Sequence, residues 1–217
     1  MAVPTAEVNT VFGSISPMAV ITAEGHSVLV IDPLYHSNST LSTSEKQALE
    51  NAVIAFRNKY PAFGALYHAL VANGITIAFK IDPNISSNAQ YGINGNIYFK
   101  NGNTINSDNL AEELIHAMQH NIYGSVFTNT VKNYEFEAKV FQDLACTFSG
   151  LGCPMFAASG QSFAYQYSLW VDSFVFPSNR FFEGNDIIQF LAYCSQWTGY
   201  SGTFNSSFTP DLLLSFF

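Results

Sequence analysis

The amino-acid sequence predicts an α+β fold, in which a small antiparallel or mixed sheet and several helices precede a helical half rich in aromatic residues. Three observations predict this fold. The patterns along the chain run from helices to a few short strands and back to helices. The strand-like stretches are short and β-branched, whereas the helix-like stretches repeat apolar residues every three or four positions. Aromatic residues then dominate the chain from Pro154 onward.

The first half of the chain predicts a buried strand followed by two helices. Residues 28–31 are four consecutive apolar residues that a turn terminates, as in a short buried strand. Ser42 is followed three residues later by Glu45, which is a capping box, and we expect a helix from there to Pro61. A second helix is expected over residues 63–72.

Strands and turns follow, and then longer helices. Residues 75–81 are rich in β-branched residues and predict a strand. Residues 91–96 are typical of a turn, and residues 97–99 predict another strand. Helices are expected over 107–123, 133–148, 161–174 and 186–197.

Composition limits the classes of function. Of the 217 residues, 48% are hydrophobic and 11% are charged, which provides a sizeable core and excludes intrinsic disorder. A formal net charge of −8 does not attract phosphate backbones, so we expect no nucleic-acid partner. No apolar run approaches the roughly 18 residues of a membrane span, so no transmembrane segment is expected. The chain begins without the basic and apolar regions of a signal peptide, so none is expected in it.

Uncharged polar residues and cysteines bear on the location of the protein. Asn and Ser stand where Lys and Glu are usual, as in residues 37–40 and 101–109, and such a surface favours a secreted or cell-envelope protein. The cysteines Cys146, Cys153 and Cys194 are too few for a disulfide scaffold and allow one bridge at most.

The expected helix over 107–123 carries chemically active side chains on one face. Glu112 and His116 are four residues apart, so their side chains lie one above the other and can share a cation. Glu113 lies beside them, three residues before His116, where it can hold a water bound to that cation. The alternative is an ordinary polar face of an amphipathic helix that meets solvent.

The following helix places a carboxylate within its apolar stripe. Glu137 lies near the centre of the stripe that runs from Tyr134 to Phe148, whereas Glu135 lies on the opposite side. A buried carboxylate costs on the order of several kcal/mol unless a cation, an ion pair or protonation compensates it. A metal ion is therefore one predicted partner of Glu137, and hydrogen bonds to the backbone or an ion pair with Lys132 or Arg180 are the alternative.

The segment Glu112-Glu113-Leu114-Ile115-His116 resembles the HExxH active-site helix of zincin metallopeptidases, with Glu in place of the first His. In gluzincin members of that superfamily, a Glu on the following helix is the third ligand. Glu135-Phe136-Glu137-Ala138 also resembles the ExxA segment of some gluzincins, which favours Glu135, whereas amphipathicity favours Glu137. We therefore expect Glu112, His116 and Glu137 as metal ligands, with Glu135 as an alternative to Glu137.

The resemblance implies both a fold and an activity. Residues 1–217 would form a single zincin-like domain, with the active-site helices in an α+β part over about 1–150 and a helical part over 151–217. The protein would be a metal-dependent peptidase that acts on a peptide or protein, with Glu113 as the general base for a metal-bound water. Tyr123, on the same helix face, would stabilise the developing oxyanion.

The resemblance also leaves alternatives open. The implied metal is zinc, but two carboxylates and one imidazole form a harder site than zinc usually occupies, so manganese or iron is an alternative. A shifted register with His116 and His120 as ligands leaves Ala117 where the base should stand. In this family the strand before the helix binds an extended peptide along its edge, and residues 97–99 are the expected strand. The alternative function is a catalytically inactive zincin-like binding or interaction module of the cell envelope or extracellular space.

Overall fold

The computed structural model describes residues 22–23, 26–27, 32–128, 130–176 and 180–217. The chain divides into two compact units, residues 1–32 and residues 33–217. The described part of the first unit is a short antiparallel pair of strands, β1 (Thr22–Ala23) and β2 (His26–Ser27). The strand expected at residues 28–31 lies outside the described residues.

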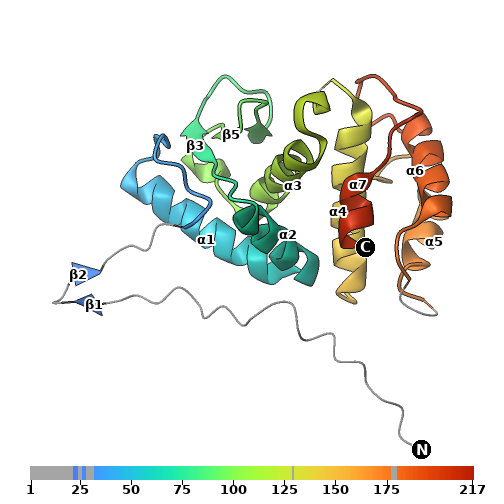
Figure 1. The fold of residues 1–217 in the computed structure, drawn as a ribbon, viewed down its shortest axis with the longest axis horizontal. Helices are drawn as coiled ribbons and strands as arrows, with labels where there is room; N and C mark the ends of the chain where they lie inside the picture. The colour runs from blue at the N-terminus through green and yellow to red at the C-terminus, as the bar shows by residue number, and fades with distance from the viewer. Residues whose placement is uncertain (1–21, 24–25, 28–31, 129, 177–179) are drawn as a thin grey trace, which may run out of the picture. The chain divides into compact units, whose positions relative to one another are not determined.

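The second unit combines helices with a small mixed sheet, which confirms the α+β class (Figure 1). Its strands are β3 (Ala78–Ile81), β4 (Ala89–Tyr91) and β5 (Asn96–Phe99). Its α-helices are α1 (Thr43–Lys59), α2 (Pro61–Ala72), α3 (Ser107–Tyr123), α4 (Lys132–Phe148), α5 (Ala164–Asp172), α6 (Gly184–Gln196) and α7 (Asp211–Phe216). Short 3₁₀ turns, η1 (Gly102–Thr104) and η2 (Gly124–Val126), flank α3.

The three-stranded sheet has the order β3-β5-β4, with β5 parallel to β3 and antiparallel to β4. The expectation that residues 97–99 offer a free edge to a peptide is therefore wrong, because β5 is the central strand and pairs on both sides. The strands at the edges are β3 and β4, and β4 was not predicted from the sequence: the turn expected over residues 91–96 begins at its last residue, Tyr91.

Local sequence signals fix the ends of the helices that position the site. Ser42 accepts a hydrogen bond from the Glu45 backbone at the start of α1, and the Glu45 side chain accepts one from Ser42, so the predicted capping box is confirmed. The helix α3 has the predicted bounds. Asn106 caps its first turn through the backbone amides of residues 108 and 109, and Gly124, with φ of +58°, ends it.

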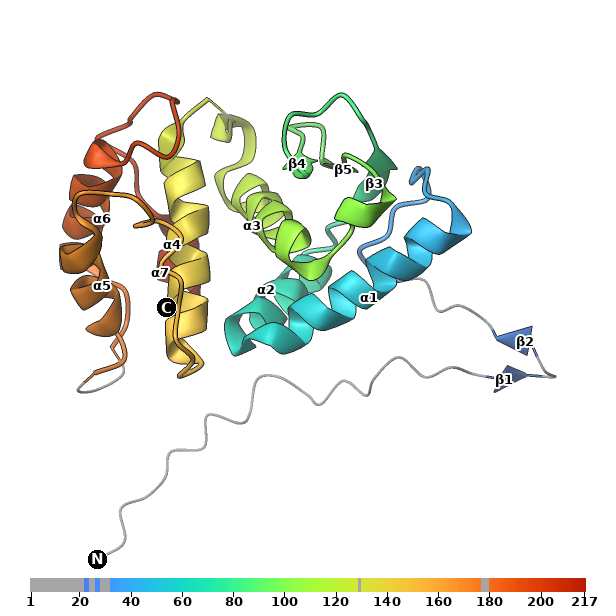
Figure 2. The ribbon, with the colours of Figure 1, turned by 180° about the vertical axis from the view of Figure 1, so that it is seen from behind.

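The helix α4 lies at the centre of the helical arrangement. It contacts α2 and α3 on one side and α5 and α6 on the other, and α7 packs on α4 while also contacting α2 and α3 (Figures 1 and 2). Most of its residues are buried all around the helix, including Phe136 and Phe141. The aromatic-rich C-terminal part packs against it, and the Phe136 ring contacts Phe190 and Trp197. These aromatic residues are core.

Cys146 and Cys153 form a disulfide at the end of α4, and Cys194 is a buried thiol, consistent with the single bridge that the sequence allows. Over the described residues, every helix is too short or too polar to cross a bilayer.

Candidate metal centre

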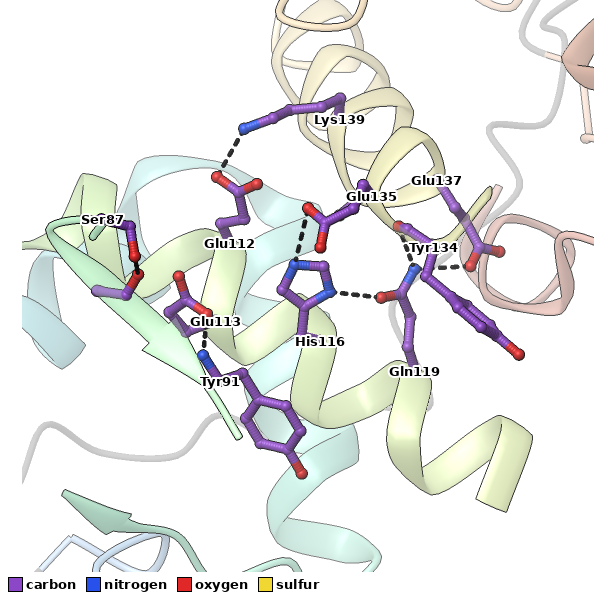
Figure 3. A network of polar contacts seen from close by, with 12 residues as sticks. Ser87, Tyr91, Glu112, Glu113, His116, Gln119, Tyr134, Glu135, Glu137 and Lys139 are labelled. Atoms are coloured by element: carbon purple, nitrogen blue, oxygen red, sulfur yellow. Dashed lines mark hydrogen bonds and ion pairs between the residues drawn. The ribbon is translucent and has the colours of Figure 1, made fainter. Parts of the chain in front are cut away.

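The neighbouring helices α3 and α4 bring three potential metal ligands together. Glu112 and His116 come from α3 and Glu135 comes from α4, and one ligand atom from each lies within 4.8 Å of the others. Figure 3 shows the three side chains pointing toward one another across the gap between the helices. The i, i+4 spacing on α3 places the first two on the same face, as the sequence predicts.

The helices α3 and α4 run antiparallel here, and two ion pairs connect them. His116 Nε2 lies 3.6 Å from Glu135 Oε2, and one turn away Lys139 Nζ lies 2.6 Å from Glu112 Oε2. Both of these ion pairs are partly or largely buried. Each ligand carboxylate therefore has a cationic neighbour on the other helix.

The charges in this group shift one another's protonation. Burial lowers the pKa of His116, but hydrogen bonding and attraction from Glu135, with smaller contributions from the other acidic groups, raise it to about 9. Burial favours the protonated form of Glu135, yet the interaction with His116 outweighs this and holds the pKa of Glu135 below its ordinary value. Without a metal ion, the two groups therefore form a buried ion pair.

Glu113 faces the same pocket from the next position on α3. Its Oε2 accepts a hydrogen bond from the backbone N–H of Tyr91 in β4. Burial raises the pKa of its carboxyl to about 7, although the nearby His116 opposes the shift. Its Oε1 accepts no hydrogen bond from a described residue, so this oxygen is available within the pocket.

The group opens into a pocket of about 460 Å³. Residues 86–91 form one wall, which includes the edge strand β4, and α3 forms the floor. Glu135 and Tyr200 complete the lining. The site is thus accessible to a ligand and is bordered by a strand edge.

The preferred third ligand of the sequence analysis, Glu137, is not part of this group, and the alternative Glu135 is. The Glu137 side chain is fully buried, as its place in the apolar stripe predicts. However, it points away from the group, toward the end of α3 and the C-terminal segment (Figure 3). It accepts hydrogen bonds from Gln119 Nε2 at 2.8 Å, from the Tyr123 hydroxyl at 2.8 Å and from the Leu212 backbone at 3.1 Å. These bonds compensate its burial only in part, because burial still raises the pKa of Glu137 to about 8.

Tyr123 and His120 also lie apart from the three ligands. The Tyr123 hydroxyl donates to Glu137, and the backbone N–H of Asp211 donates to the hydroxyl at 2.8 Å. The residues that line the pocket do not include Tyr123, so the proposed contact with an oxyanion has no support in its position. His120 Nδ1 lies 2.9 Å from the Tyr91 hydroxyl, and its ring stacks on Phe127.

Sequence reasoning missed several residues of the site. Lys139 follows Glu135 by one helical turn and faces Glu112, and this i, i+4 spacing was a signal that could have identified it. Gln119 was visible only as part of the polar face, although its side chain joins His116 to α4. Tyr200 reaches the pocket from a segment with no distinguishing pattern.

No family model, curated protein or solved structure matches this chain. The assignment of a function therefore depends on the geometry of the site.

Proposed function

We propose that Glu112, His116 and Glu135 hold a divalent metal ion, with zinc as the proposed ion, and that the protein is a metal-dependent peptidase. The convergence of three ligand atoms within 4.8 Å, from two helices, carries this proposal. One imidazole and two carboxylates are acceptable ligands for zinc, and for manganese or iron. Three protein ligands and an open position are typical of a catalytic metal site, and here the pocket leaves one side of the three residues open to a substrate.

When bound, the metal would supply a Lewis acid that polarises a peptide carbonyl. Glu113 would accept a proton from the attacking water on Oε1 and deliver it to the leaving amine, because that oxygen is available in the pocket. The Tyr91 N–H would hold the other oxygen, Oε2, and so orient the carboxylate. A pKa near 7 suits a group that both takes up and releases a proton at neutral pH.

The edge strand β4 supports a polypeptide as the substrate class. Among the described strands, β4 pairs only with β5, and its residues 89–91 line the pocket. The Tyr91 N–H and the Ala89 carbonyl already bond Glu113 and Ser87, so an extended peptide would lie along the wall formed by residues 86–91 and use the remaining polar groups there. This role belongs to β4 in place of residues 97–99.

Metal content and peptide cleavage test the proposal in the full chain. The purified protein incubated with zinc should retain close to one ion, and His116→Ala should retain none. Glu113→Gln should keep the zinc and lose cleavage of unfolded casein or of a peptide library, because it removes the base and leaves the ligands intact. Glu50→Gln on α1, far along the chain, is the control and should change neither result. A native protein that takes up neither zinc, manganese nor iron would overturn the proposal.

The ion pairs of the site favour a second candidate, a catalytically inactive binding module. Lys139 neutralises Glu112 and protonated His116 neutralises Glu135, so the group is balanced in charge without a metal. In this case the metal-free protein folds stably, and Glu113→Gln has the same properties as the wild type in every assay. The zinc measurement separates the two candidates.

A further inference from the structure

We infer that Gln119 is a positioning residue for the metal centre: it fixes the proton of His116 on Nδ1, and Glu137 holds Gln119 in the orientation that does so. Nε2 is thereby left to face Glu112 and Glu135. The consequence for metal binding rests on the proposed function, whereas the hydrogen-bonding arrangement does not.

The first step is the orientation of the Gln119 side-chain amide. Its nitrogen lies 2.9 Å from the backbone oxygen of Tyr134 and 2.8 Å from Glu137 Oε2. A backbone carbonyl can only accept a hydrogen bond, so the amide NH₂ group must be the one that faces it. The opposite orientation would place the Gln119 carbonyl oxygen against the Tyr134 carbonyl oxygen, which cannot donate, and is excluded by their repulsion.

The second step is the protonation of the imidazole. The Gln119 carbonyl oxygen lies 2.7 Å from His116 Nδ1, and both atoms are buried. Because that oxygen carries no hydrogen, Nδ1 must donate, and this holds for both the neutral and the charged ring. In the neutral ring the lone pair then lies on Nε2, which is the nitrogen that points toward Glu135.

The third step is what holds Glu137. Its carboxyl group accepts from Gln119 at Oε2 and from the backbone N–H of Leu212, at the start of α7, at Oε1. The Tyr123 hydroxyl contacts both oxygens. A buried chain of hydrogen bonds therefore runs from α7 through Glu137 and Gln119 to His116, and Figure 3 shows its last three members in line. We therefore assign buried Glu137 to this chain of hydrogen bonds and not to the group of metal ligands.

This arrangement matters for affinity because a metal binds only the unprotonated nitrogen of a histidine. Outer groups that fix a ligand histidine typically change metal affinity 10–100-fold when they are removed. Gln119→Met keeps the length and burial of the side chain and removes the acceptor at Nδ1. We therefore expect a loss of zinc affinity of about 10–100-fold in this variant.

The experiment compares Gln119→Met with Gln142→Met in the full chain. Gln142 is a similarly buried glutamine on α4, and its side chain donates a hydrogen bond to the Ala138 carbonyl within the same helix. The first measurement is the ¹H–¹⁵N NMR signal of the His116 Nδ1–H in metal-free protein, recorded at a pH at which the ring is neutral and carries one proton, and assigned by its loss in His116→Ala. The second is zinc affinity by competition with a chromophoric chelator. Circular dichroism and urea unfolding verify that both variants are folded.

The wild type and Gln142→Met should show a slowly exchanging Nδ1–H and equal zinc affinity. Gln119→Met should exchange that proton faster than the wild type does and bind zinc more weakly by the factor given above. A wild-type signal at Nε2 in place of Nδ1, or unchanged proton exchange in Gln119→Met, would overturn the inference whatever the metal result. Failure of the wild type to bind zinc, with the Nδ1–H signal as expected, would instead contradict only the proposed function.

A double-variant cycle tests the part played by Glu137. The amide of Glu137→Gln can accept at one end only, so it cannot serve Gln119 and Leu212 as the carboxylate does. Glu137→Gln should weaken zinc binding in the wild-type background and should have no further effect in Gln119→Met. Equal losses in the two backgrounds would show that Glu137 acts on the site independently of Gln119.

Discussion

At the scale of single residues, the buried carboxylates of α4 show how the same burial is compensated by different partners. Asp143 is fully buried and accepts hydrogen bonds from the backbone N–H groups of Phe156 and Ala157 and from the Tyr167 hydroxyl on α5. Burial raises the pKa of Asp143 to about 6, although these bonds and the charge of Lys139 oppose the shift. The folded protein therefore binds a proton at Asp143 more tightly than the unfolded chain does.

We expect the stability that depends on Asp143 to decline as pH rises. A raised carboxyl pKa contributes stability that is present below the ordinary value of 3.8 and is lost as pH passes through about 6. The difference in free energy of unfolding between wild type and Asp143→Asn should therefore fall by up to about 3 kcal/mol from pH 4 to pH 7. Tyr167, which donates to the carboxyl, stays protonated in this range because burial raises its pKa. Urea unfolding of both proteins across the range is the measurement, and a constant difference would contradict the expected titration.

Residue types and their spacing predicted much of the candidate site. They did not predict which carboxylate of α4, Glu135 or Glu137, joins the group. Glu112, Glu113 and His116 followed from helical spacing, which is a local property of the sequence. The burial of Glu137 was also predicted correctly. Its partners were not predictable, because Leu212 and the segment around it reach Glu137 only through the tertiary fold. A buried carboxylate therefore indicated a compensated charge without indicating which group compensates it.

At the scale of elements, the length of a segment decided how well the sequence predicted it. The helices α1 and α3 carry caps and long periodic patterns, and their bounds were predicted closely. By contrast, β4 has three residues and α7 has six, which is too short for either periodicity to be recognisable. Both short elements touch the site: β4 borders the pocket and α7 holds Glu137. Contacts in the tertiary fold determine these two elements, and local sequence propensity does not.

The disulfide at the end of α4 gives a prediction for this element. Cys146 and Cys153 are separated by 7 residues, and the bridge fixes the turn that leads to Phe156 and Ala157, which bind Asp143. Closing a loop of this length stabilises a fold by about 2.5 kcal/mol in the chain-entropy model. Cys153→Ser should therefore lower the free energy of unfolding by about this amount, measured with urea under non-reducing conditions.

The matched control for this change is addition of a reductant. Reductant should destabilise the wild type by a similar amount and should leave Cys153→Ser unaffected, because that variant, with the thiols of Cys146 and Cys194, has no bridge to lose. A wild type whose stability is insensitive to reductant would show that the bridge does not stabilise the native state.

At the scale of the whole molecule, α4 joins the two halves of the second unit. It packs on α3, which carries two of the candidate ligands, and on the aromatic helices of the C-terminal part. A metal ion held by Glu112, His116 and Glu135 would cross-link α3 to α4 at the centre of this arrangement. Because unfolding must separate these helices, metal release and global unfolding should be linked.

This linkage predicts a zinc-dependent melting temperature. A ligand at 100 times its dissociation constant stabilises the native state by about 2.7 kcal/mol, which for a domain of this size raises the melting temperature by roughly 5–10 °C. Differential scanning calorimetry of wild type with zinc should show this increase, and excess chelator should reverse it. Glu135→Gln should show a much smaller increase, because it loses an anionic ligand, whereas Glu50→Gln should melt as the wild type does. A melting temperature that zinc leaves unchanged in the wild type would mean that the ion pairs of Lys139 and His116 satisfy the site by themselves, as the binding-module alternative requires.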